Sequence, residues 1–400
     1  MLSMWPQIIF WISLAGITST YGFYPLVCRW LAKHFPHPPA NSNEIVLPTL
    51  TVIIVAHNEA ARLPRRITNL LSSDYPPEKL SILIMDDGST DATSSVLGAI
   101  NNKRVRWQHL PERKGKPAAL NIGIAASSSE VCVLADARQT FSTETIRRLA
   151  IAFSDPGVGA VSGELEIAAS TSAIGSGIGS YWKRERQLRA DEAAYDSCIG
   201  CTGACYAIRR SEFQPLPEDT LLDDVVIPLR IAVRGFRILH DRQALAFDEQ
   251  PQEPEFEARR KRRTLAGNFQ MLFRYPAWLL PKGHRLWWRI IAHKYLRIAV
   301  PLLLLGAAVG SAALWESTFY RTSLYLQAFC YLLGVCGLVS GSRFKICSLP
   351  AGFLFLNAMV VAAFFDYATG KTTSKWATAN LATEDPKLIN STLDTTNPRR

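Results

Sequence analysis

The first 28 residues of this 400-residue chain contain no charged side chain. Within and just beyond them, Ile8 to Leu31 is mostly apolar and aromatic, which meets the roughly 20 residues that a membrane-spanning helix requires. A cleaved signal peptide would carry basic residues before its apolar segment, but here Arg29 and Lys33 follow it. The sequence therefore predicts a retained membrane anchor over residues 1–34, with its C-terminal side in the cytoplasm.

Charge is also absent from three long stretches near the other end of the chain. They are Ile298–Trp315, Thr322–Ser342 and Ile346–Phe365. So many uncharged stretches of nearly spanning length are rare in soluble domains, which disfavours the alternative of buried core helices. We expect three transmembrane helices within residues 298–367.

The distribution of basic residues predicts how these helices are oriented. The short loop with Arg343 and Lys345 suits the cytoplasmic side, as does the chain between the first and second predicted spans. We therefore expect an integral, multi-pass protein of the plasma (inner) membrane with a cytoplasmic middle region. An interfacial amphipathic segment is expected over residues 276–297 and a polar tail over 368–400, and the charges of the tail leave its side of the membrane open.

Several features of other protein classes are missing. The net charge of +10 is accompanied by no nucleic-acid-binding motif, and basic residues crowd near the predicted spans, so we assign the charge to an anionic lipid leaflet. Cys198, Cys201 and Cys205 are followed by no second Cys/His pair at a suitable distance, which favours reduced thiols over zinc. One leading and three trailing spans show no paired halves, which argues against a transporter.

The middle region alternates short apolar runs with amphipathic stretches, a pattern typical of β-α units. Predicted strands are Leu50–Ala56, Ser81–Met85, Val105–His109 and Val131–Ala135, and predicted helices are Glu59–Ser72, Asp91–Ile100, Lys116–Ala126 and Thr143–Phe153. The expected fold class is α/β with a mostly parallel sheet, in which ligands bind beyond the carboxyl ends of the strands.

Acidic residues follow two of these strands. Asp86 and Asp87 come before a helix, so the sequence leaves open whether they cap that helix or accept hydrogen bonds from a nucleoside. Asp136 ends another strand and is followed by Arg138. A third acidic pair, Asp223 and Asp224, begins a later helix, and its second member is a candidate general base.

Basic residues occur in two clusters. Arg113 to Lys116 precede a helix that begins near Pro117, so their side chains and free N–H groups suit a diphosphate, although a solvated basic loop is the simpler alternative. Arg259 to Arg263 lie before the membrane region, where they suit lipid, substrate or both.

Seven stretches in this order resemble family 2 glycosyltransferases of the membrane-embedded branch that contains cellulose, hyaluronan and poly-N-acetylglucosamine synthases. They are VAHNEA at 55–60, MDDGSTDAT at 85–93, RKGKPAALN at 113–121, LADAR at 134–138, GCTGACYAIRR at 200–210, LLDDV at 221–225 and RKRRTLAGN at 260–268. The resemblance implies a GT-A fold, Rossmann-like, over residues 45–275.

The resemblance also implies roles for individual residues. Donor binding is implied for Ala56, His57, Glu59, Asp86, Asp87, Lys116, Asp136, Arg138, Arg260 and Arg263. Asp136 would also hold a divalent cation, Mg²⁺ or Mn²⁺, on the donor diphosphate. Gly203, with Thr202 and Ala204, would border the acceptor. Asp224, next to Asp223, would remove the proton from the acceptor hydroxyl.

Three motifs depart from the pattern of the family. Arg138 replaces the second acid of Asp-x-Asp, and Leu222-Asp223 stands where Thr-Glu is common. Arg260 and Thr264 replace the Gln and Trp of Gln-x-x-Arg-Trp. The first departure removes an acid that would be expected to bind the metal ion. The last removes the aromatic platform that supports a growing polymer, which argues against processive synthesis.

The expected function is an inverting membrane glycosyltransferase that moves a sugar from a nucleotide-sugar, preferably a UDP-sugar, to a glycan or lipid-linked acceptor. Its expected place is cell-surface polysaccharide or cell-wall biogenesis, with other polysaccharide-assembly proteins as possible partners. The alternative is a catalytically silent membrane sensor or scaffold that binds nucleotide-sugars.

Overall fold

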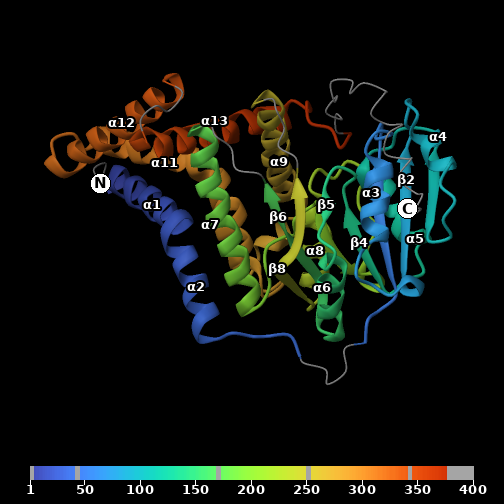
Figure 1. Ribbon diagram of the computed structural model, residues 1–400. Coiled ribbons are helices and arrows are strands. Elements are labelled where there is room, and N and C mark those ends of the chain that lie inside the picture. The colour runs from blue at the N-terminus through green and yellow to red at the C-terminus, as the bar shows by residue number, and fades with distance from the viewer. Residues whose placement is uncertain (1–3, 41–45, 168–172, 249–253, 341–344, 376–400) are drawn as a thin grey trace, which may run out of the picture.

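The computed structural model describes residues 4–40, 46–167, 173–248, 254–340 and 345–375. A sheet covered by helices forms one side of the molecule, and long helices form the other (Figure 1). Of the predicted polar tail, the structure describes only residues 368–375.

The sheet has eight strands in the order β3-β2-β1-β4-β7-β6-β8-β5. Its first half is parallel, as predicted, and contains β1 (Leu50–Ala56), β2 (Leu80–Asp87), β3 (Val105–Leu110) and β4 (Val131–Ala135). The second half is mixed, and contains β5 (Thr140–Phe141), β6 (Val158–Ile167), β7 (Cys205–Arg209) and β8 (Arg237–Asp248). There β7 runs antiparallel to β4 and β6, whereas β8 runs parallel to β6.

The central strands are buried on both faces, which explains their almost continuous apolar sequence. Val52 and Ile54 of β1 belong to one apolar cluster and Ile53 and Val55 to the other, as the period of two residues requires. The helices that accompany these strands in the sheet domain are α3 (Leu63–Leu71), α4 (Thr93–Gly98), α5 (Lys116–Ala126), α6 (Thr145–Ile151) and α8 (Asp223–Val233).

Helix α3 begins four residues later than predicted, because the preceding residues form a turn. Asn58 has a positive φ of 56°, and its side-chain oxygen accepts the N–H of Thr90 at 2.8 Å. This contact ties the end of β1 to the loop after β2. The structure thereby fixes two of the predicted site loops relative to each other.

Three helices of the described residues are long and apolar enough to cross a membrane. They span Trp287–Ala313, Thr318–Val339 and Ile346–Ala368, which confirms the three predicted C-terminal spans. They include the helices α11 (Leu296–Ala313), α12 (Thr318–Val339) and α13 (Lys345–Ala368).

The predicted N-terminal anchor is helical but interrupted. Helix α1 (Met4–Thr18) and helix α2 (Tyr24–His34) are joined by a π-helical segment, η1 (Ser19–Phe23), so neither regular helix alone has spanning length. Helix α1 packs along α11, whereas α2 packs against a helix of the sheet domain. The role of residues 1–34 as a membrane anchor stays a prediction.

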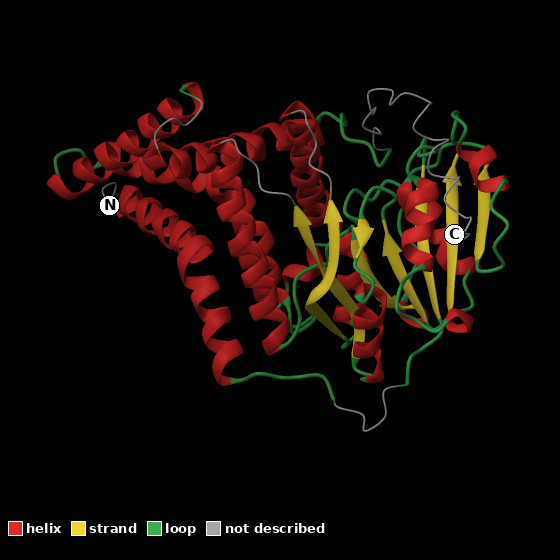
Figure 2. Ribbon diagram, in the orientation of Figure 1, coloured by secondary structure: helices red, strands yellow, loops and turns green. Residues whose placement is uncertain are grey.

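Long helices connect the sheet to the apolar bundle (Figure 2). Helix α7 (Ala173–Tyr195) packs against α2 and α13, and α9 (Pro254–Arg274) packs along α13. The segment predicted as interfacial contains the 3₁₀ turn η5 (Pro276–Leu279), the short helix α10 (Trp287–Ile290) and the π-helical segment η6 (Ile291–Tyr295), which leads directly into α11. The domain boundaries themselves stay predictions.

Candidate active site

The loops after β1 and β2 hold each other in place. His57 Nδ1 lies 2.9 Å from the carbonyl oxygen of Asp87, and Glu59 accepts a hydrogen bond from Arg62 at 2.7 Å. Burial raises the pKa of Glu59, although Arg62 opposes that shift. Ala56, also expected at the nucleoside pocket, is fully buried in the core, so its side chain is a packing element.

Asp86 and Asp87 are fully buried and hydrogen-bonded within the protein. Asp86 accepts bonds from Ser94 Oγ at 2.5 Å and the N–H of Ser89 at 3.1 Å, and lies 2.9 Å from His109 Nδ1. Burial alone would raise the pKa of Asp86, but these hydrogen bonds lower it. Neither acid caps the following helix α4, whose N-cap is Ala92; instead Asp91 Oδ1 accepts the N–H of Thr93 at 2.9 Å in the turn before it.

Asp87 organises the basic loop before α5. Its two carboxylate oxygens accept the N–H groups of Lys114 at 2.7 Å and Gly115 at 2.9 Å. Gly115 has φ +96°, a conformation that favours glycine, and it precedes the first residue of the helix. Asp87 thus sets the position from which Lys116 enters the site.

Lys116 joins two of the predicted acidic positions. Its Nζ lies 2.8 Å from Asp136 Oδ1 and 3.5 Å from Asp223 Oδ2. Burial alone would lower the pKa of Lys116, but Asp136 and Asp223 raise it above its ordinary value. The end of β4, the start of α5 and the start of α8 therefore meet at the ammonium group of Lys116.

Asp223 and Asp224 differ in environment, although they are adjacent. Asp223 is buried and faces Lys116, whereas Asp224 is partly exposed. Burial and the neighbouring charge of Asp223 raise the pKa of Asp224 to about 6, against the opposing effect of Lys116. Asp224 is therefore the partly exposed member of the pair, and a carboxyl group with its pKa could accept a proton near neutral pH.

The predicted acceptor loop lies directly against Asp224. A Cβ atom on Gly203 would come within 2.9 Å of Asp224 Oδ2, so the absence of a side chain permits this approach. The N–H of Cys201 donates to the carbonyl oxygen of Asp224 at 2.8 Å, and that of Thr202 donates to Ser162 Oγ at 3.0 Å. Ala204 is buried beside them.

The cysteines around this loop are buried free thiols. Burial raises the pKa of Cys198 and of Cys205 to about 12 in each case, which keeps these thiols protonated. Across the described ranges, no three His, Cys, Asp or Glu side chains cluster as a metal site would require. The expectation of ordinary reduced thiols agrees with these surroundings.

Arg138, at the altered Asp-x-Asp position, forms an ion pair with the buried carboxylate of Asp248 at the end of β8. Asp136 keeps one carboxylate oxygen away from Lys116, and its side chain is 41% exposed. A Mg²⁺ or Mn²⁺ ion bound by one carboxylate, substrate phosphates and water would fit this arrangement. A site built from protein ligands alone would not.

The basic cluster of α9 faces the end of the membrane bundle. Arg262 makes a bidentate ion pair with Asp366 of α13, at 2.8 and 2.6 Å. Arg263 Nε lies 3.4 Å from the carbonyl oxygen of Thr373. Ser374 follows, and its Oγ would lie 3.0 Å from a Cβ atom on Gly115. The chain after α13 thus connects the expected donor residue Arg263 with the basic loop, and Arg260 lies on the same helix one turn earlier.

One group of polar residues near the acceptor loop was not predicted. Glu185, Arg189 and Glu192 of α7 and His293 of η6 form a buried network. Its α7 residues recur at spacings of three and four, which places them on one helix face, but this pattern is common on solvated helices. The sequence offered no other signal for their burial.

Comparisons with known proteins bear on the fold and the family. Residues 51–215 match the family described as Glycosyl transferase family 2. The chain is 23% identical over 285 residues to the probable glycosyltransferase YdaM of Bacillus subtilis, covering 67% of this chain and 68% of the relative. It is 30% identical over 179 residues to an N-acetylglucosaminyltransferase of Rhizobium meliloti, covering 42% and 41%.

A poly-β-1,6-N-acetyl-D-glucosamine synthase of Staphylococcus aureus is 24% identical over 258 residues, covering 60% of this chain and 57% of the relative. The matches thus span about half the length of the last two relatives. Among solved structures, the mannosyltransferase PcManGT from Pyrobaculum calidifontis, in complex with GDP-Man and Mn²⁺, superposes with a TM-score of 0.69 at 22% identity. That likeness covers 91% of this chain and 99% of the other, and shows a shared GT-A fold. Residues 51–215 thus match glycosyltransferase family 2 and have a GT-A fold, and the relatives of this chain are named as glycosyltransferases.

Proposed function

We propose that this protein is an inverting membrane glycosyltransferase that transfers a sugar from a nucleotide-sugar to a hydroxyl group of a glycan or lipid-linked acceptor. The observation that carries the proposal is the position of Asp224. It is partly exposed and lies against Gly203 of the acceptor loop, and its neighbour in the chain, Asp223, lies 3.5 Å from Lys116 Nζ.

Asp224 acts as the general base in this proposal. Because its pKa is raised to about 6, roughly ten ionised carboxylates are present for each protonated one at pH 7. An ionised carboxylate within hydrogen-bond reach accepts the proton of the attacking hydroxyl. The oxygen then forms a bond to the anomeric carbon as the bond to the nucleoside diphosphate breaks, and a single attack from the opposite face inverts the configuration.

Lys116 and the basic loop stabilise the departing diphosphate. Helix α5 begins at Lys116, so the positive end of its dipole lies beside the Lys116 side chain, an arrangement that favours phosphate. Asp136 would hold a divalent cation, which supplies further positive charge to the diphosphate when bound. Arg138 is positioned by Asp248 and adds a fixed guanidinium near the end of β4.

The names of the relatives suggest the order in which donors are tested. An N-acetylglucosaminyltransferase and a poly-β-1,6-N-acetyl-D-glucosamine synthase make UDP-N-acetylglucosamine our first candidate, in line with the expected UDP-sugar. GDP-mannose is the second candidate, because PcManGT was solved with GDP-Man. Their names also support the expected role in polysaccharide assembly at the cell surface.

A membrane location is supported by the three apolar helices of spanning length. We propose a multi-pass protein of the plasma (inner) membrane with the catalytic domain in the cytoplasm, where nucleotide-sugars are made. Labelling of a thiol introduced at the exposed position Glu78 (Glu78→Cys), from either side of sealed membrane vesicles, tests this orientation.

The proposal is tested with full-length protein in lipid nanodiscs and a panel of UDP- and GDP-sugars. Release of nucleoside diphosphate and transfer of sugar are measured for the wild type and for Asp224→Asn, with the exposed residue Glu78→Gln as the matched acid-to-amide control. We expect Asp224→Asn to lose transfer while still binding donor. Equal rates of transfer for wild type and Asp224→Asn would remove Asp224 as the base, whereas donor binding without transfer by the wild type would support the alternative of a silent sensor or scaffold.

A further inference from the structure

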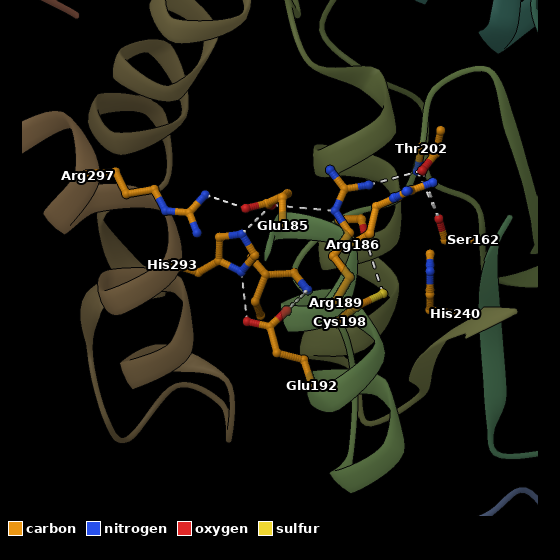
Figure 3. Close-up of polar contacts among 12 residues, drawn as sticks. Ser162, Glu185, Arg186, Arg189, Glu192, Cys198, Thr202, His240, His293 and Arg297 are labelled. Atoms are coloured by element: carbon orange, nitrogen blue, oxygen red, sulfur yellow. Dashed lines mark hydrogen bonds and ion pairs between the residues drawn. The ribbon is translucent and has the colours of Figure 1, made fainter. Parts of the chain in front are cut away.

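A charged network lies behind the acceptor loop, between the sheet domain and the membrane bundle (Figure 3). At its centre, His293 of η6 is completely buried. Its Nε2 lies 2.7 Å from Glu185 Oε1 and its Nδ1 lies 2.7 Å from Glu192 Oε1. The two glutamates are two helical turns apart on α7, so His293 fills the space between them.

Both ring nitrogens of His293 face a glutamate, so the ring is held from two sides. Burial alone would raise the pKa of each glutamate, but their neighbours, first Arg297 beside Glu185 and His293 beside Glu192, lower it. The two carboxylates therefore fix the orientation of the ring.

Each glutamate also reaches the acceptor loop. Glu192 Oε2 accepts the N–H of Ile199 at 3.2 Å. Glu185 lies 3.5 Å from Arg189, and Arg189 Nη1 donates to Thr202 Oγ1 at 3.0 Å. Two arms thus run from His293 to the two sides of the segment 199–202.

The far side of that segment is the catalytic face. Between the two arms, the N–H of Cys201 donates to the carbonyl oxygen of Asp224, and Gly203 lies against the Asp224 carboxylate. Tyr24 of α2 donates to Glu192 as well, so the N-terminal helix joins the same network. A side chain on the membrane-side helix is therefore connected to the proposed base through one hydrogen-bonded loop.

We propose that His293 is a positioning residue for acceptor transfer, and that it holds the loop of residues 199–203 against Asp224 through Glu185–Arg189 and Glu192. The inference rests on the proposed function in so far as Asp224 is the base. A buried ionic cluster of this size contributes little to stability compared with apolar packing, because each charge must be removed from water. Its value lies in the fixed geometry that it imposes on the loop.

The test uses full-length protein in nanodiscs and the variant His293→Gln, with the exposed residue His34→Gln as control. Hydrogen exchange is followed in peptides that cover residues 198–204 and β1, and steady-state kinetics give KM for donor and acceptor separately. In His293→Gln we expect exchange of the loop amides to rise about tenfold while β1 stays protected. The acceptor kcat/KM should fall about tenfold, with the donor KM within about twofold of the wild type.

Thr202→Val provides a second route that leaves His293 in place. It removes the hydroxyl that accepts hydrogen bonds from Arg189 at 3.0 Å and Ser162 at 3.3 Å, so it should reproduce the acceptor defect, and Thr202→Ser should rescue it. Because both changes act on one path, the effects of His293→Gln and Thr202→Val should be less than additive.

Unchanged loop exchange in His293→Gln, equal loosening of β1, or full additivity with Thr202→Val would each overturn the inference. If the wild type transfers no sugar from any donor, the proposed function fails, and the exchange experiment still decides whether His293 positions the loop.

Discussion

The Nζ atom of Lys116 lies 2.8 Å from Asp136 Oδ1 and joins the start of α5 to the end of β4. Lys116→Gln removes this cation from the proposed diphosphate site. We expect the donor KM to rise about tenfold, which corresponds to about 1.4 kcal/mol of lost binding energy. Lys116→Arg should recover part of the loss, and the exposed control Lys103→Gln should leave the donor KM unchanged. Donor titration in the transfer assay measures the effect, and an unchanged donor KM in Lys116→Gln would contradict the assignment.

The raised pKa of Asp224 predicts a pH dependence of both activity and stability. Below about pH 6 the carboxyl is protonated and cannot accept a proton, so kcat/KM should fall as the pH decreases through about 6. Stability has the opposite dependence on this group, because a folded pKa above the unfolded value favours folding at low pH. Asp224→Asn should therefore be more thermostable than the wild type at pH 8, with the difference disappearing near pH 4. Melting curves at both pH values measure this, and an equal difference at pH 4 and pH 8 would contradict it.

Gly203→Ala places a methyl group within 2.9 Å of Asp224 Oδ2, so the carboxylate must shift. A displacement of the base by a fraction of an ångström should lower kcat about tenfold or more while donor binding is retained. Gly22→Ala is the matched control, because no atom lies within 4 Å of a Cβ built there. Comparison of kcat with donor affinity checks the prediction, and parallel loss of both would point to misfolding instead.

Arg138→Gln leaves the buried carboxylate of Asp248 without its ion-pair partner. Breaking a buried pair on one side costs about 3 kcal/mol, so the melting temperature should fall clearly. The double variant Arg138→Gln/Asp248→Asn removes both charges and should regain much of the stability. Thermal unfolding gives the melting temperatures of the single and double variants. A double variant no more stable than Arg138→Gln would refute the pairing.

Chelation should lower transfer, and Mg²⁺ or Mn²⁺ should restore it, because Asp136 presents a free carboxylate oxygen beside the proposed diphosphate site. Donor binding to Asp136→Asn should lose most of its dependence on metal. Calorimetric titration of donor with and without EDTA measures both effects. Equal donor affinity with and without metal would assign the positive charge to Lys116 and Arg138 alone.

The parallel half of the sheet was predictable because its information is local. β1 and β4 have the predicted bounds, since each is an uninterrupted apolar run that ends in polar residues. The antiparallel strand β7 was not predicted, because Cys205–Arg209 is short and its pairing with β4 depends on a partner about 70 residues away in the sequence. Strand β6 was not predicted for the same reason, because the strands with which it pairs lie far from it along the chain.

The candidate site was predicted as a set of residue types, but not as a set of contacts. Lys116, Asp136 and Asp223 come together as the strand-end rule requires. The rule does not distinguish residues that face substrate from those that support the backbone. Asp87 gives both of its oxygens to the Lys114–Gly115 backbone, and this became visible only from its distances. His293 was likewise recognised as a possible positioning residue only from its burial in the folded structure. A single histidine in a predicted amphipathic segment has no characteristic sequence pattern.

The apolar cluster on one face of the sheet continues without interruption into the membrane bundle. It contains Ile53 of β1, Phe269 of α9, and Val360 and Ala363 of α13. A catalytic domain cut out at residue 275 would expose the apolar surface that α13 covers and would aggregate or unfold. Enzymology of this protein therefore needs the intact chain in a bilayer, and lipid thickness becomes an experimental variable of the same standing as pH or substrate concentration.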